Sequence, residues 1–151
     1  MITLKRTDSS NPDFVELVAL LDAELKIRDG EDNAFYAQYN GISDLKQVVV
    51  AYKDGHAVSC GAIKAYDEES MEVKRMYTRE ETRRQGIAHQ VLAELEKWTS
   101  EMGYNSCILE TGFRNPEAIK LYESINYKVI PNFGQYQGVA NSCCFLKSVN
   151  S

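Results

Sequence analysis

The segment Arg83-Arg84-Gln85-Gly86-Ile87-Ala88 joins a predicted strand, Met71–Thr78, to a predicted helix that continues to about Met102. A helix begins with backbone N–H groups that have no intrahelical partner and with a partial positive charge. Gly86 lets the backbone approach a ligand closely, small Ala88 keeps the first turn open, and two arginines add positive charge. The segment therefore predicts a binding site for an anion such as a pyrophosphate.

Other phosphate motifs fit this segment poorly. A P-loop needs Gly-Lys followed by Ser or Thr, whereas Gly86 precedes Ile87-Ala88. A dinucleotide fingerprint needs GxGxxG after the first strand of a βαβ unit, and neither condition is met. From these residues alone, a solvated basic turn that caps a helix remains an equal alternative.

The elements on either side are indicated by apolar spacing and turn residues. Asn11-Pro12 and Asn115-Pro116 each read as a helix cap followed by proline at the first helical position, and Asp54-Gly55 predicts a hairpin turn. Asn126 is expected to end the last helix in a left-handed conformation. The predicted strands are Ile2–Arg6, Gln47–Lys53, Ala57–Ala65, Met71–Thr78, Ser106–Thr111, Tyr127–Ile130 and Ser142–Val149, and a second short helix is expected around Phe35–Tyr39.

Length and composition indicate one globular domain, residues 1–151. The chain is 44% hydrophobic and 26% charged, and its net charge of −5 argues against general nucleic-acid binding. No apolar run approaches the roughly 18–20 residues that cross a bilayer, so no membrane partner is expected. The first residues contain no apolar signal-peptide core, which favours a cytoplasmic location.

Four cysteines lie in apolar runs without CxxC spacing: Cys60, Cys107, Cys143 and Cys144. Structural zinc needs paired ligands, and only His56 and His89 are available to supplement these thiols. We therefore expect reduced thiols in the core and no metal site.

Two motifs resemble the GNAT superfamily of N-acetyltransferases. Arg83-x-x-Gly86-x-Ala88 is similar to its Q/R-x-x-G-x-G/A motif, and Asn115-Pro116-Glu117-Ala118-Ile119-Lys120-Leu121-Tyr122 is similar to its N-x-x-A-x-x-L/F-Y pattern. Ala88 replaces the commoner last glycine, and Asn126 replaces the glycine that usually precedes the final aromatic residue. The resemblance implies an α/β (α+β) fold: a mixed, mostly antiparallel sheet of about seven strands flanked by about four helices.

The same resemblance implies acetyl-CoA as the acetyl donor. Its pyrophosphate is expected on the backbone N–H groups of Arg84, Gln85, Gly86, Ile87 and Ala88, beside the positive charge of Arg83. Its pantetheine arm is expected along Met76, Tyr77 and Thr78, where this strand splays from Ser106–Thr111, with Asn115 near the thioester. The family roles further assign the Met76 N–H to the oxyanion and the Tyr122 hydroxyl to protonation of the departing thiolate.

Acetyl transfer also requires a neutral amine, although a lysine-like amine with a pKa of about 10.4 is mostly protonated at neutral pH. A carboxylate can remove this proton directly or through water. Glu72, eleven residues before Arg83, occupies the position of the general base in some family members, and Glu110 on the neighbouring strand is the rival. A water chain in place of either carboxylate is a third alternative.

The resemblance also implies that the acceptor enters opposite the cofactor, between the early helices and the last strand pair. The residues there are acidic and aromatic, which suits a cationic amine but equally suits a solvated surface: Asp29, Glu31, Asp32, Tyr36, Tyr39 and Phe133-Gly134-Gln135-Tyr136. We therefore expect an N-acetyltransferase that acts on a primary amine of a small molecule by direct attack in a ternary complex. The alternatives are a protein or peptide amine as acceptor, a non-catalytic CoA-binding sensor, and a peptide-binding interaction domain. A homodimer is compatible with the sequence, which leaves the oligomeric state open.

Overall fold

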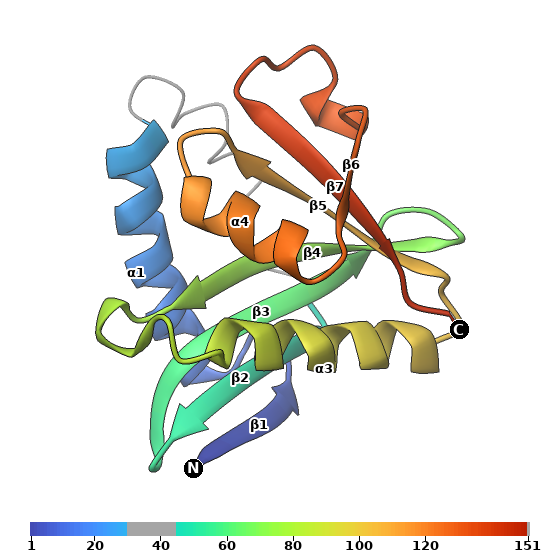
Figure 1. Cartoon of the computed structure of the whole chain (residues 1–151). Helices are drawn as coiled ribbons and strands as arrows, with labels where there is room; N and C mark the ends of the chain where they lie inside the picture. The colour runs from blue at the N-terminus through green and yellow to red at the C-terminus, as the bar shows by residue number, and fades with distance from the viewer. Residues whose placement is uncertain (30–44, 151) are drawn as a thin grey trace.

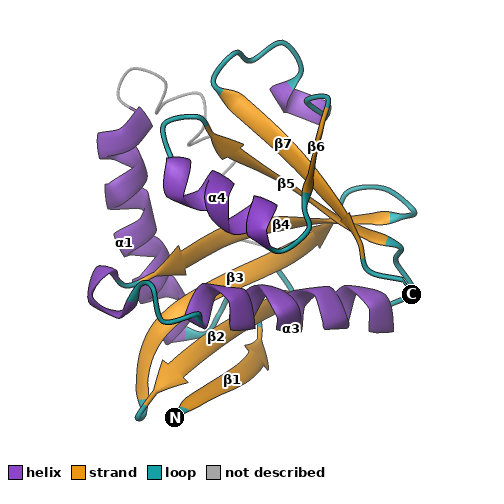
Figure 2. Ribbon diagram, in the orientation of Figure 1, coloured by secondary structure: helices purple, strands orange, loops and turns teal. Residues whose placement is uncertain are grey.

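The computed structural model describes residues 1–29 and 45–150. Within these residues, seven strands form one sheet with helices on both faces (Figures 1 and 2). In chain order the elements are β1 (Ile2–Thr7), α1 (Pro12–Asp29), β2 (Gln47–Lys53), β3 (His56–Ala65), β4 (Ser70–Thr78), the 3₁₀ helix η2 (Glu80–Thr82), α3 (Ile87–Glu101), β5 (Ser106–Gly112), α4 (Pro116–Ser124), β6 (Lys128–Ile130), the 3₁₀ helix η3 (Gly134–Tyr136) and β7 (Ser142–Ser148).

The caps and turns form where the sequence predicts them. The side-chain oxygen of Asn11 accepts the N–H groups of Asp13 at 2.8 Å and Phe14 at 3.2 Å, and so begins α1. The expected hairpin turn is present, with positive φ at both Asp54 and Gly55, and Asn126 has φ 76° after α4. The short helix expected around Phe35–Tyr39 lies outside the described residues, which contain three α-helices where about four were expected in the whole chain.

The sheet order is β1-β2-β3-β4-β5-β7-β6, and β4 pairs with β5 in parallel while the other neighbours are antiparallel. The parallel register joins only Ser70–Glu72 to Ser106–Ile108. Beyond it the two strands separate toward their arrowheads, as Figure 1 shows. This confirms the expected mixed sheet, and it leaves the second half of β4 without a strand on its β5 side.

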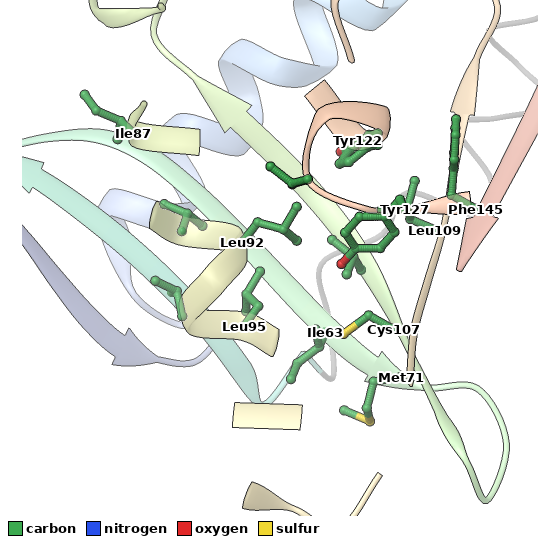
Figure 3. Packing of buried hydrophobic residues seen from close by; sticks show 14 of the residues in the cluster. Ile63, Met71, Ile87, Leu92, Leu95, Cys107, Leu109, Tyr122, Tyr127 and Phe145 are labelled. Atoms are coloured by element: carbon green, nitrogen blue, oxygen red, sulfur yellow. The ribbon is translucent and has the colours of Figure 1, made fainter. Parts of the chain in front are cut away.

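The core lies on both faces of this sheet, because strand residues alternate in direction. On one face, the strands pack against α3 and α4 through residues that include Ile63, Leu92, Leu95, Leu109 and Phe145 (Figure 3). On the other face, Val48, Val50 and Cys60 pack against Phe14 and Leu17 of α1. All four cysteines are buried free thiols.

A β-bulge interrupts β4 in its middle. Arg75 has φ 59°, and the register of β3 against β4 shifts between Cys60 and Ala62. The Met76 side chain lies over Gly61, where an added Cβ would collide with Met76 Sδ and come within 2.9 Å of Leu95 Cδ1. The bulge thus directs Met76 to the α3 face while Arg75 points to α1, where it binds Asp22.

Candidate active site

A pocket of about 490 Å³ lies where the end of β4, the start of α3, α4 and α1 meet. It brings together residues that are far apart in the sequence. Ten of the predicted cofactor-binding residues line it: Met76, Tyr77, Thr78, Arg83, Arg84, Gly86, Ile87, Ala88, Asn115 and Tyr122. Gln85 does not line the pocket, and its side chain instead accepts a hydrogen bond from Lys53 Nζ at 2.6 Å.

The start of α3 presents its backbone to this pocket. Gly86 is the N-cap with φ 78°, and its carbonyl accepts the first helical hydrogen bond, from the Gln90 N–H at 3.1 Å. The N–H groups of Ile87, Ala88 and His89 therefore precede the helical ladder. An added Cβ at Gly86 would meet no protein atom within 4 Å, so the space beside this residue is open. These features fit an anionic group held by main-chain donors.

The two arginines of the loop differ in their surroundings. The Arg83 guanidinium donates to the Thr78 carbonyl at 2.8 Å and to Glu24 at 2.7 Å, and it lies over the Tyr77 ring at 5.5 Å. Its side chain therefore links the loop to β4 and α1, and its charge is partly offset by Glu24. Arg84 is exposed, has φ 67° and lines the pocket. The sequence did not reveal this difference, because Glu24 is 59 residues from Arg83.

The second half of β4 forms one wall of the pocket. Its β3 side is bonded within the sheet, with Ser59 Oγ also donating to the Tyr77 carbonyl at 2.8 Å. On its β5 side the sheet pairing has ended at Glu72. The backbone of Met76–Thr78 therefore borders the pocket along an edge that β5 does not cover.

Tyr122 lies deep in this region, with 6% of its surface exposed. The centroid of its ring lies 5.7 Å from that of Tyr127 and 5.9 Å from that of Phe145. Figure 3 labels these three side chains in the core. Burial, together with the charge of Glu110, raises the pKa of the Tyr122 hydroxyl above its usual value. The hydroxyl is therefore protonated at neutral pH, as a proton donor must be.

A second pocket of about 170 Å³ adjoins the first and shares Met76, Asn115 and Tyr122 with it. Both candidate bases, Glu72 and Glu110, line this second pocket. Glu72 is 8% exposed, and burial raises its pKa, while the charges of Lys74 and Lys64 oppose that rise. A carboxylate with a raised pKa accepts a proton more readily than an exposed one.

The predicted acceptor residues divide into two groups. Tyr136 is buried and lines the second pocket, and Phe133 packs against it and against Tyr66. Glu31, Asp32, Tyr36 and Tyr39 lie outside the described residues, as does the side chain of Asp29.

Sequence reasoning assigned no role to Lys74, although its place two residues after Glu72 on a strand puts both on one face.

Within the described residues, no three or more His, Cys, Asp or Glu side chains are grouped so that they would hold a metal ion. Among the helices of residues 1–29 and 45–150, none has the length and apolar content to span a membrane.

Known proteins resemble this chain in sequence and in fold. The model of the Acetyltransferase (GNAT) family matches residues 14–127. Uncharacterized N-acetyltransferase YsnE of Bacillus subtilis (strain 168) is 33% identical over 101 residues, which are 66% of this chain and 67% of YsnE. The structure of a putative acyl-CoA N-acyltransferase from Klebsiella pneumoniae has a TM-score of 0.84 at 27% identity, covering 99% of both chains.

The likeness of fold extends to more distant proteins. The PaiA N-acetyltransferase of Thermoplasma acidophilum, solved in complex with coenzyme A, has a TM-score of 0.72 at 17% identity. The match covers 98% of this chain and 99% of PaiA. At that identity, the comparison concerns the fold alone.

Proposed function

Because this chain belongs to the GNAT family of acetyl-CoA-dependent acetyltransferases, we propose that it transfers the acetyl group to a primary amine of a small molecule. The transfer occurs by direct attack in a ternary complex. One observation carries this proposal: the larger and the smaller pocket meet at Met76, Asn115 and Tyr122. A donor in the first pocket and an acceptor in the second would therefore face each other beside a protonated phenol.

In this proposal the larger pocket holds acetyl-CoA. The main-chain N–H groups at the start of α3 bind the pyrophosphate, and exposed Arg84 and Lys120 on the pocket wall add positive charge. The open edge of Met76–Thr78 pairs with the amide groups of the pantetheine arm. Arg83 acts through Glu24 and Thr78 to fix the loop in place.

The smaller pocket then supplies the proton transfers. Glu72 takes a proton from the acceptor amine, directly or through water. The Met76 N–H donates to the oxygen of the tetrahedral intermediate, a contact typically worth about 2.7–4 kcal/mol. Tyr122 protonates the departing thiolate. Since that thiol has an ordinary pKa of about 8.5, it is a fair leaving group even without the acid.

The test is release of free coenzyme A from acetyl-CoA in the presence of small amines, amino acids and a lysine-containing peptide. Turnover with one or more small amines supports the proposal. Turnover with the peptide alone would replace the small-molecule acceptor by a protein amine. Tight coenzyme A binding without any turnover would instead indicate a sensor, and no binding of any coenzyme A species would refute the proposed cofactor site.

A further inference from the structure

The smaller pocket contains charges of both signs. Glu72 and Glu110 contribute carboxylates from adjacent strands, and Lys74 contributes an ammonium group. Arg75 also borders this pocket, but its guanidinium is paired with Asp22 of α1. Besides this arginine, the charged groups that border the space are two acids and a lysine, in a cavity that opens to the proposed position of the thioester.

The Lys74 ammonium is held close to Glu72 without a close hydrogen bond. Its Nζ lies 3.8 Å from Glu72 Oε2, whereas a hydrogen bond between these atoms would measure about 2.7–3.2 Å. The two side chains are only 12% and 11% exposed. A lysine ammonium has three donors, so Lys74 retains capacity to bind an anionic group in the pocket.

A simple cationic amine matches this arrangement only in part. Its ammonium would be attracted to Glu72 and Glu110 but would also approach the Lys74 cation in a poorly solvated space, where like charges repel strongly. A molecule that carries both an amine and a carboxylate matches all three groups. Its amine satisfies the acids, and its carboxylate satisfies the lysine.

We propose that the acceptor is a small amino-carboxylate compound of the α-amino-acid type, with its amine beside Glu72 and Glu110 and its carboxylate on Lys74 Nζ. This inference rests on the proposed function, because it assigns the smaller pocket to the acceptor. Lys74 becomes a specificity-determining residue that contacts the substrate. Leu21, Leu25 and Leu109 also line this pocket, and their apolar side chains face the rest of the acceptor.

The reaction balances without any further reagent. The amine nitrogen forms a bond to the acetyl carbon while the carbon–sulfur bond breaks. The acceptor's ammonium group first loses one proton to Glu72 or to water, and the departing thiolate receives a proton from Tyr122. The nitrogen loses a second proton, which returns to Tyr122 and restores its hydroxyl, so one proton is released overall. The products are an N-acetylated amino acid and free coenzyme A. The amide product no longer carries a positive charge for the two carboxylates, which favours its release.

Three matched acceptors test this assignment: leucine, leucinamide and isopentylamine. They share a hydrocarbon chain, and only leucine retains the carboxylate. We expect kcat/KM for leucine to exceed that for leucinamide and isopentylamine by about 10-fold or more, in the range expected for one contact with a charged group. If the wild-type enzyme prefers leucinamide or isopentylamine to leucine, the inference is overturned while the proposed acetyl transfer stays intact.

Substitution of Lys74 isolates its contribution. Lys74→Gln is expected to abolish the preference for leucine over leucinamide, and Lys74→Arg is expected to retain it. Lys64→Gln is the matched control. Lys64 lies opposite Glu72 in the register of β3 against β4, but it is exposed and does not line the pocket. If Lys74→Gln retains the wild-type preference, the assignment of Lys74 is wrong.

A binding measurement separates this inference from the catalytic one. Calorimetry with leucine and leucinamide, in the presence of coenzyme A, reports acceptor affinity without turnover. Tighter binding of leucine by the wild type, lost in Lys74→Gln at an unchanged melting temperature, supports the carboxylate contact even if acetyl transfer fails. Equal affinity for both ligands would refute that contact.

Discussion

Tyr122 allows the proposed chemistry to be tested at a single atom. Its phenylalanine variant removes the hydroxyl but retains the ring contacts with Tyr127 and Phe145. We expect Tyr122→Phe to lower kcat by about 100-fold, at the low end for general acid catalysis, because the thiolate is a fair leaving group. The affinity for acetyl-CoA, measured by calorimetry, should change little. Tyr104→Phe serves as the control, because Tyr104 is half-buried against the same core and lines neither pocket. Wild-type turnover by Tyr122→Phe would exclude the acid role.

Glu72 gives the reaction a characteristic pH dependence. A base must be deprotonated, so kcat/KM should fall as the pH falls through the pKa of Glu72, which burial raises above its ordinary value. Glu72→Gln is expected to lower kcat/KM by about 100-fold near neutral pH and to remove this acid limb. Glu110→Gln should retain the limb. If both variants retain it, the proton passes through a water chain instead.

The sequence predicted which residues gather at the site better than it predicted what each side chain does. Met76, Gly86, Asn115 and Tyr122 could be placed together because short motifs and a family resemblance locate them. The bonds of Arg83 could not be predicted, since its partner Glu24 comes from a helix that only the tertiary fold brings near. The roles of Met76, Glu72 and Tyr122 in catalysis stay predictions.

At the scale of elements, the start of α3 is the feature that binds the anion in this account. Gly86 and Gly103 flank this helix at opposite ends, both have positive φ, and an added Cβ at either would meet no protein atom within 4 Å. Valine at either position should therefore cause similar backbone strain. We expect Gly86→Val to weaken coenzyme A binding at least about 10-fold by calorimetry, and Gly103→Val to leave it near wild type. Equal losses of coenzyme A affinity in the two variants would show that backbone strain causes the effect.

The bulge in β4 is a second element whose geometry can be tested. Gly61→Ala would place a Cβ against Met76 Sδ and near Leu95. Because the Met76 side chain must move, we expect a loss of about 1–3 kcal/mol in the free energy of unfolding and a lower kcat. Urea denaturation and steady-state kinetics measure the two effects. A variant with wild-type stability and activity would show that the Met76 packing does not position β4.

Most elements could be predicted because their signals are local. Asn-Pro caps, the Asp-Gly turn and apolar spacing depend on neighbouring residues, and the structure has each of these features. The bulge gave no such signal, since Arg75 adopts φ 59° without being Gly, Asn or Asp. Its position depends on Gly61 of the adjacent strand and on the Arg75–Asp22 pair, which are contacts at long sequence separation.

At the scale of the whole molecule, the fold follows from the order of elements, whereas the acceptor does not. The expected mixed sheet and the separation of β4 from β5 are both present. The composition of the smaller pocket emerges only when β4, β5, α1 and Tyr136 are brought together. The residues first expected at the acceptor side suggested a cationic amine. In our proposal, the half-buried Lys74 beside Glu72 instead favours an acceptor with charges of both signs.

The proposed acetyl transfer depends on where the chain holds its thioester substrate. A crystal structure of the protein with acetyl-CoA tests this most directly. We expect the pyrophosphate within hydrogen-bonding distance of the main-chain N–H groups that begin α3, and the acetyl group between Met76 and Tyr122. A pyrophosphate bound at another surface, or an acetyl group remote from Tyr122, would contradict it.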